Sequence, residues 1–110
     1  MIARPALMRA GLCGLLSAVA VLVLPLAARA ADAAHGEVMA KRWCASCHIV
    51  SADQKAGSTQ APPFSAIAKE PAFDAGKVAF YLLLPHPQMA DIGLTRDDAS
   101  DLAAYIARQK

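Results

Sequence analysis

The run Cys44-Ala45-Ser46-Cys47-His48 constrains this chain more than any other segment. Two cysteines three residues apart lie about one helical turn from each other, on the same face of a helix. Both can therefore bond to the vinyl groups of one porphyrin, while His48 reaches the iron as its proximal ligand. This spacing is the attachment signature of a c-type haem, so we expect one haem held covalently by Cys44 and Cys47.

Two other uses of the cysteine pair fit the sequence less well. A structural zinc site needs four converging Cys or His ligands. Adjacent residues such as Cys47 and His48 point about 100° apart on a helix, and the chain has no second C-x-x-C pair. A thioredoxin-like dithiol is expected beside a βαβ pattern and leaves His48 without a role. Both remain open as alternatives at the level of sequence.

The first thirty residues have the pattern of a secretory signal peptide. Arg4 and Arg9 form a basic start, residues 12–24 are apolar, and Ala28-Arg29-Ala30 has the small-x-small form of a cleavage site. We therefore predict a cleaved leader at 1–30, a periplasmic location and no integral membrane span after cleavage. The apolar stretch is short for a transmembrane helix, but retention of the leader as an anchor stays an alternative.

Cleavage would leave residues 31–110 as one small domain. It removes three arginines and no acidic residue, so the 11 basic residues fall to 8 against 9 acidic ones, and the net charge changes from +2 to −1. Such a chain has no basic cluster for nucleic acid, which we exclude as a partner. A covalently held haem would supply apolar mass that a domain of this size lacks.

The remaining pattern predicts an all-α domain with three main helices. Helical periodicity covers about 34–47, 74–84 and a last helix that follows Thr95, with a brief helical turn at 64–69. The spacing of Thr95 and Asp98 predicts a capping box. Apolar residues in the second helix predict burial on more than one of its sides, and Pro85 is expected to end it.

In order and spacing, the attachment run and three further segments resemble a class I cytochrome c of the small, secreted bacterial type. These segments are Ala61-Pro62-Pro63-Phe64, Pro85-His86-Pro87-Gln88-Met89 and Leu102-Ala103-Ala104-Tyr105-Ile106. The resemblance covers residues 34–110. It implies the small cytochrome c fold, with three helices wrapped around one covalently bound haem.

The resemblance also implies roles for single positions. Gly36 matches the glycine at which the first and last helices cross, where Leu102 and Tyr105 would meet it. Pro62 matches the proline whose carbonyl accepts a hydrogen bond from the proximal histidine. Met89 matches the distal methionine, so His48 and Met89 would be the two iron ligands.

Two other residues compete with Met89 for the distal position. Met39 lies only five residues before Cys44, on the same helix, and would not reach the opposite face of the haem. His86 is the stronger rival and would give the iron two histidine ligands. Met89, 41 residues beyond His48 in a proline-bounded loop, can wrap around the porphyrin.

Filled axial positions favour a one-electron carrier without catalytic residues, because no site is left for dioxygen or a substrate. We expect redox proteins as donor and acceptor, although the sequence identifies neither. A dedicated cytochrome subunit of a dehydrogenase or oxidase complex is an alternative within electron transfer. A haem-based gas sensor or peroxidase-like enzyme would need Met89 to detach readily, and no residue group for peroxide chemistry stands out.

Overall fold

Helices make up the regular structure of residues 28–58, 60–84 and 88–110, the part of the chain that the computed structural model describes. In chain order they are α1 (Ala33–Met39), the π-helical segment η1 (Ala40–Cys44), α2 (Phe64–Ala68), α3 (Ala75–Leu82) and α4 (Arg96–Ala107). No strand occurs in these ranges. The predicted all-α class is confirmed, whereas most of the predicted leader, residues 1–27, lies outside the described residues.

Side-chain caps explain where the longer helices begin. The Asp32 carboxylate accepts hydrogen bonds from the backbone N–H groups of Ala34 at 2.9 Å and His35 at 3.2 Å, which starts α1. At α4 the Thr95 hydroxyl accepts from the Asp98 N–H, and the Asp98 carboxylate accepts from the Thr95 N–H. This pair confirms the predicted capping box.

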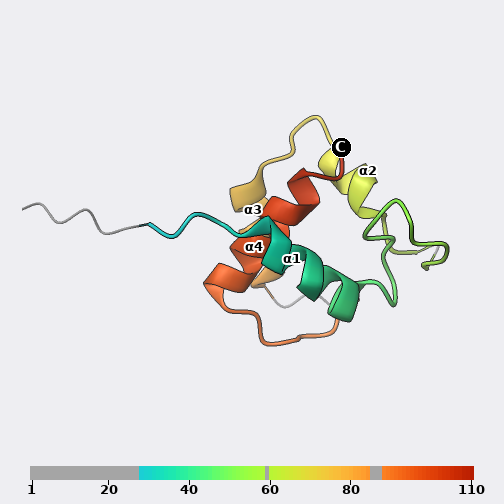
Figure 1. Ribbon diagram of the computed structural model, residues 1–110, viewed down its shortest axis with the longest axis horizontal. Coiled ribbons are helices and arrows are strands. Elements are labelled where there is room, and N and C mark those ends of the chain that lie inside the picture. Colours follow the sequence, from blue (N-terminus) through green and yellow to red (C-terminus); the bar gives the residue numbers. More distant parts are fainter. Residues whose placement is uncertain (1–27, 59, 85–87) are drawn as a thin grey trace, which may run out of the picture.

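The first and last helices cross at Gly36, where α1 packs on α4 (Figure 1). A Cβ atom at Gly36 would lie 2.6 Å from the backbone carbonyl carbon of Asp101 and 2.9 Å from Tyr105 Cβ. The expected approach to Tyr105 is present, and the contact with the backbone of Asp101 was not predicted. Asp101 and Tyr105 are four residues apart and share a face of α4. A contact between Leu102 and Gly36 stays a prediction.

The hydrophobic core gathers around this crossing. Its buried residues come from α1, η1, α2, α4 and the loop after the attachment run: Ala33, Met39, Ala40, Val50, Phe64, Ala68, Leu102, Tyr105 and Ile106. The Tyr105 hydroxyl donates a hydrogen bond to the Val50 carbonyl at 2.8 Å, so its polar end is satisfied inside the core. Through this bond α4 holds the segment that follows the attachment run.

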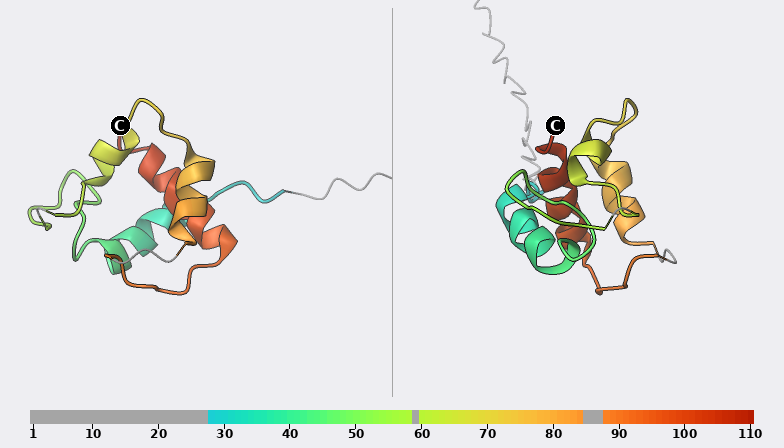
Figure 2. Two further views of the ribbon diagram at one scale, coloured as in Figure 1. Left: turned by 180° about the vertical axis from the view of Figure 1, so that it is seen from behind. Right: turned by 90° about the vertical axis from the view of Figure 1, so that its right-hand side faces the viewer.

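Helix α3 lies alongside α4 in both views of Figure 2 and packs on it. Val78 and Leu82 are half-buried against the core, whereas Phe80 is 65% exposed. Val78, Tyr81 and Leu82 also line the cavity described below. Burial of α3 on more than one side stays a prediction.

Asp101 is a buried carboxylate in this otherwise apolar crossing. It accepts from the Asp32 N–H at 2.6 Å and from His35 Nδ1 at 2.8 Å, and it pairs with Arg29 at 3.4 Å. Burial acts to raise the pKa of Asp101, but these three partners outweigh burial and hold the pKa below its usual value of 3.8. The Asp101 carboxylate thus holds the start of α1 against α4.

We predict that Gly36→Ala destabilises the chain although alanine is the better helix former. The methyl group would collide with the backbone of Asp101, so α1 must move away from α4. This overpacking should lower the free energy of unfolding by about 1–3 kcal/mol. For a domain of this size each kcal/mol corresponds to about 4–8 °C in Tm. Thermal unfolding followed by far-UV circular dichroism measures the effect.

Gly76→Ala in α3 is the matched control. There the nearest atom to an added Cβ is Asp74 Oδ1 at 3.2 Å, a side-chain oxygen that caps α3 by accepting from the Lys77 N–H and needs to move only slightly. Its free energy of unfolding should change by no more than about 1 kcal/mol. Equal Tm values for the Gly36→Ala protein and the wild type would contradict the close crossing.

We also predict that Asp101→Asn lowers the free energy of unfolding by an amount that depends on pH. At neutral pH the substitution should cost about 1–3 kcal/mol, because it removes the buried charge with which Asp32, His35 and Arg29 interact. The pKa of Asp101 is lowered in the folded state. Its stabilisation is therefore complete above the unfolded pKa and is lost as the pH falls through the lower folded value.

Denaturant unfolding of both proteins at pH 7 and at pH values below 4 measures this difference, which should shrink on acidification. Asp97→Asn, at an exposed position of the same helix, is the control and should behave like the wild type. A difference that stays constant down to the lowest pH would contradict a lowered pKa of Asp101.

Candidate functional site

The attachment run follows directly on a π-helical turn at the end of the first helix. The Ala45 N–H donates to the Ala40 carbonyl at 3.0 Å, a bond that spans five residues instead of four. The N–H groups of Cys47 and His48 then donate to the Cys44 carbonyl at 3.1 and 2.8 Å. We expected the first helix to run to Cys47, but it ends at Cys44, and Cys47 and His48 lie in the turn that follows. The π-helical turn at its end was not predicted.

The His48 ring is held by the loop that precedes α2. Its Nδ1 lies 2.6 Å from the Pro62 carbonyl oxygen. A carbonyl only accepts hydrogen bonds, so Nδ1 carries the proton and Nε2 keeps a free lone pair. The ring centroid lies 5.4 Å from that of Phe64, whose own ring meets Tyr105 edge-on at 6.3 Å. The orientation of His48 is therefore tied to the core.

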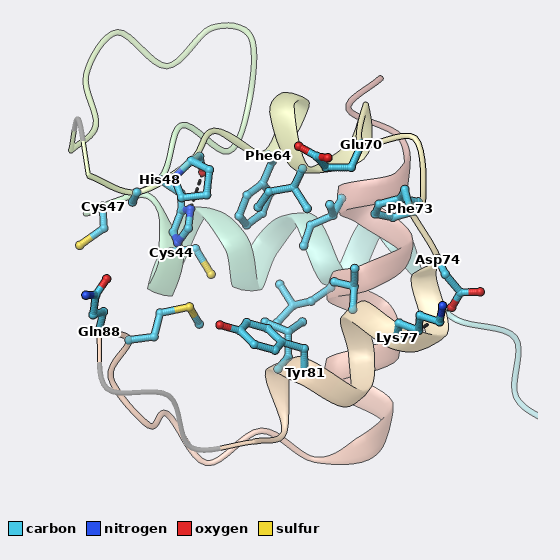
Figure 3. Close-up of a pocket in the computed structure, with 18 of the residues that line it drawn as sticks. Cys44, Cys47, His48, Phe64, Glu70, Phe73, Asp74, Lys77, Tyr81 and Gln88 are labelled. Atoms are coloured by element: carbon cyan, nitrogen blue, oxygen red, sulfur yellow. Dashed lines mark hydrogen bonds between the residues drawn. The ribbon is translucent and has the colours of Figure 1, made fainter.

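One cavity of about 1070 Å³ brings together the five predicted site residues: Cys44, Cys47, His48, Pro62 and Met89. Figure 3 shows His48 and the cysteines on one side of the cavity, with Tyr81 and Gln88 on the opposite side. Met89 is half-buried beside Gln88 in the chain. Of the rival ligands, Met39 is buried in the core, and His86 lies outside the described residues.

Apolar side chains from three helices make up much of the remaining wall. They are Phe64 and Ile67 of α2, Val78 and Leu82 of α3, Leu102 and Ile106 of α4, and Phe73 from the loop before α3. Charged groups, Glu70, Asp74 and Lys77, lie together toward one end in Figure 3. Small-molecule sites usually measure about 300–1,000 Å³, so this cavity suits a large and mostly apolar group.

The cysteines of the site differ in their surroundings. Burial raises the pKa of the Cys44 thiol above its usual value of 9.0, whereas Cys47 is exposed. The Cys44 sulfur is consequently kept as a neutral thiol at physiological pH. Within the described ranges, no group of three or more His, Cys, Asp or Glu side chains is arranged to hold a metal ion.

One curated relative decides the family. Over 79 residues the chain is 52% identical to cytochrome c-552 of Bradyrhizobium diazoefficiens, an alignment that covers 72% of this chain and 76% of the relative. The chain belongs to the class I cytochromes c. No protein-family model and no solved structure matches it.

As a cytochrome c, the protein carries covalently bound haem c and transfers electrons. The residues present fit that group: two thiols, an imidazole with a free Nε2 and an apolar cavity of sufficient size lie together. None of the helices in the described part of this cytochrome is long and apolar enough to cross a membrane.

One residue beside the site of this cytochrome was not predicted from the sequence. Gln54 binds three backbone carbonyls around the attachment run, among them that of His48 at 2.8 Å. A glutamine in a polar, turn-rich loop has the ordinary pattern of a solvated side chain. No signal in the sequence alone would have distinguished it.

Proposed function

We propose that this cytochrome is a periplasmic one-electron carrier in which His48 and Met89 are the axial ligands of a single haem. The observation that carries the proposal is the hydrogen bond from His48 Nδ1 to the Pro62 carbonyl at 2.6 Å. It leaves Nε2 available in a cavity that Met89 also lines. A soft thioether opposite an imidazole is a ligand pair used by cytochromes c.

Each residue of the site has a separate task in this proposal. Cys44 and Cys47 form the two thioethers, each thiol adding its sulfur to one vinyl carbon and its hydrogen to the neighbouring carbon. Pro62 orients the imidazole of His48 and raises its basicity, as outer hydrogen-bond partners of metal ligands do. When bound, the haem supplies an iron that gains and loses one electron.

The two proposed iron ligands explain why the proposed activity is electron transfer without catalysis. His48 and Met89 together leave no axial position for a substrate, and both stay in place in either oxidation state. The thioether of Met89 favours the ferrous state more than a second imidazole would, which raises the reduction potential. The protein thus exchanges electrons with little rearrangement of its own residues.

The proposed location of the protein follows from its N-terminal pattern, and the proposed partners follow from electron transfer. We propose export, cleavage after Ala30 and release of residues 31–110 into the periplasm. Redox proteins would be the donor and the acceptor. With a formal net charge of −1, the released chain has no strong charge bias toward one class of partner.

We predict that haem stays attached when the purified protein is extracted with acid and organic solvent. The intact mass should equal residues 31–110 plus one haem, because the leader is removed and both thioethers are covalent. Cys44→Ser should leave at most one thioether and strongly reduce the yield of haem-containing protein. Mass spectrometry of protein made in a host that matures c-type cytochromes measures both results.

Cys13→Ser is the matched control, because Cys13 is the third cysteine of the chain and lies in the predicted leader. It should change neither the mass nor the haem content. Extractable haem in the wild type would contradict the attachment. A mass that includes residues before Ala31 would contradict cleavage after Ala30.

We predict that Met89→Ala removes the distal ligand without removing the haem. The ferric protein should lose the weak far-red band that arises from sulfur-to-iron charge transfer, and its reduction potential should fall. The ferrous protein should bind carbon monoxide, which the wild type excludes because Met89 occupies the position. Absorption spectra, a redox titration and stopped-flow mixing with carbon monoxide give these results.

Met39→Leu and His86→Ala serve as controls for the two rival ligands. Both should keep the far-red band and continue to exclude carbon monoxide. If His86→Ala gives the changes predicted for Met89→Ala, the iron has two histidine ligands. Rapid and complete carbon monoxide binding by the wild type would instead favour a sensor or peroxidase-like role.

A further inference from the structure

The backbone carbonyls of the attachment run need partners that a helix does not provide. The last four carbonyls of any helix lack the N–H groups of a following turn. In this chain the Cys44 carbonyl accepts from Cys47 and His48, and the Cys47 carbonyl accepts from the Ser58 N–H at 2.7 Å. The carbonyls of Ala45 and His48 depend on a side chain.

That side chain is Gln54, which is half-buried in the loop before α2. Its Nε2 lies 3.0 Å from the carbonyl oxygen of Ala45, 2.8 Å from that of His48 and 2.7 Å from that of Ala56. The NH2 group has two hydrogens for these three acceptors, so at least one hydrogen is shared between two carbonyls. The Gln54 Oε1 accepts from the Val50 N–H at 2.9 Å. Because carbonyls only accept and an N–H only donates, these four contacts also fix which end of the amide is nitrogen.

The same four contacts connect the proximal histidine to the core by a second route. Pro62 fixes the ring of His48, while Gln54 fixes its backbone carbonyl. Gln54 also holds the N–H of Val50, a residue that is 1% exposed and whose carbonyl accepts from the Tyr105 hydroxyl. The backbone of His48 is therefore restrained toward α4 through Gln54 and Val50.

We propose that Gln54 is a positioning residue of the haem site, which sets the direction of the His48 imidazole by holding the His48 carbonyl. The inference rests on the proposed role of His48 as the proximal ligand. Rotation of an imidazole about its own bonds is limited by Pro62. Displacement of its backbone is limited by Gln54, and both restraints are needed to fix one orientation.

Two substitutions separate the donor function of Gln54 from its acceptor function. Gln54→Met has a similar length and removes both. Gln54→Glu keeps an oxygen for the Val50 N–H but removes the donors to Ala45 and His48. Only the donor side touches the His48 carbonyl, so the two variants should agree in their effect on the imidazole and differ in their effect on Val50.

The experiment is nuclear magnetic resonance on the haem-containing protein. In the ferric state the pattern of shifted haem methyl signals follows the orientation of the axial ligands, and it should change in both variants. Exchange of the Val50 amide proton should become about tenfold faster in Gln54→Met, as loss of one buried hydrogen bond implies. It should stay near the wild-type rate in Gln54→Glu.

Gln109→Glu is the matched control for the added charge. Gln109 follows the end of α4 and is not among the residues that line the cavity. Its substitution should leave the methyl pattern and the Val50 exchange rate as in the wild type. A methyl pattern that is unchanged in both Gln54 variants would mean that Gln54 stabilises the loop without orienting His48. This result would overturn the proposal.

The wild type provides a test that does not depend on the folding of a variant. The Gln54 side-chain amide protons should exchange with solvent at least about tenfold more slowly than those of a free glutamine. Exchange at the free rate would overturn the proposal even if no variant can be matured. Loss of covalent haem or of the far-red band in the wild type would instead count against the proposed function.

Discussion

The crossing of α1 and α4 at Gly36 is the contact on which the arrangement of the site depends. Helices usually pack with their axes 8–10 Å apart, and a residue without a Cβ allows the closest approach. Here the approach is so close that the backbone of Asp101 takes the space of a side chain. It fixes where η1 ends and therefore where Cys44 enters the cavity.

Around this crossing, hydrogen bonds hold segments with little regular structure in place. The described residues of the loop between His48 and Phe64 form no helix, yet Tyr105, Gln54 and Pro62 each connect this loop to the attachment run or to α4. These bonds satisfy polar groups that would be costly to leave unpaired near an apolar cavity. These hydrogen bonds thus hold the loop in place as one wall of the site.

Local signals in the sequence were sufficient for the elements that depend on neighbours in the chain. The capping box at Thr95 and the helix that follows it depend on residues within about one turn of each other. The five candidate site residues also line one cavity. Their individual roles remain proposals, because lining a cavity does not show which atom binds iron.

Features that depend on distant partners were not accessible in the same way. The π-helical turn at Ala40–Cys44 has no distinctive residue type, and the burial of Asp101 depends on His35 and the Asp32 N–H, more than sixty residues away. Gln54 is another case, because its partners are backbone carbonyls that every residue possesses.

The ion pair between Arg29 and Asp101 would differ between the precursor and the released protein. Arg29 lies one residue before the proposed cleavage point, and its guanidinium contacts both Asp97 and Asp101. Hydrolysis of the bond after Ala30 would remove this cation and create an α-ammonium group on Ala31. That group would be next to the Asp32 N–H, which already donates to Asp101. Processing would thus exchange one counter-ion of the buried carboxylate for another.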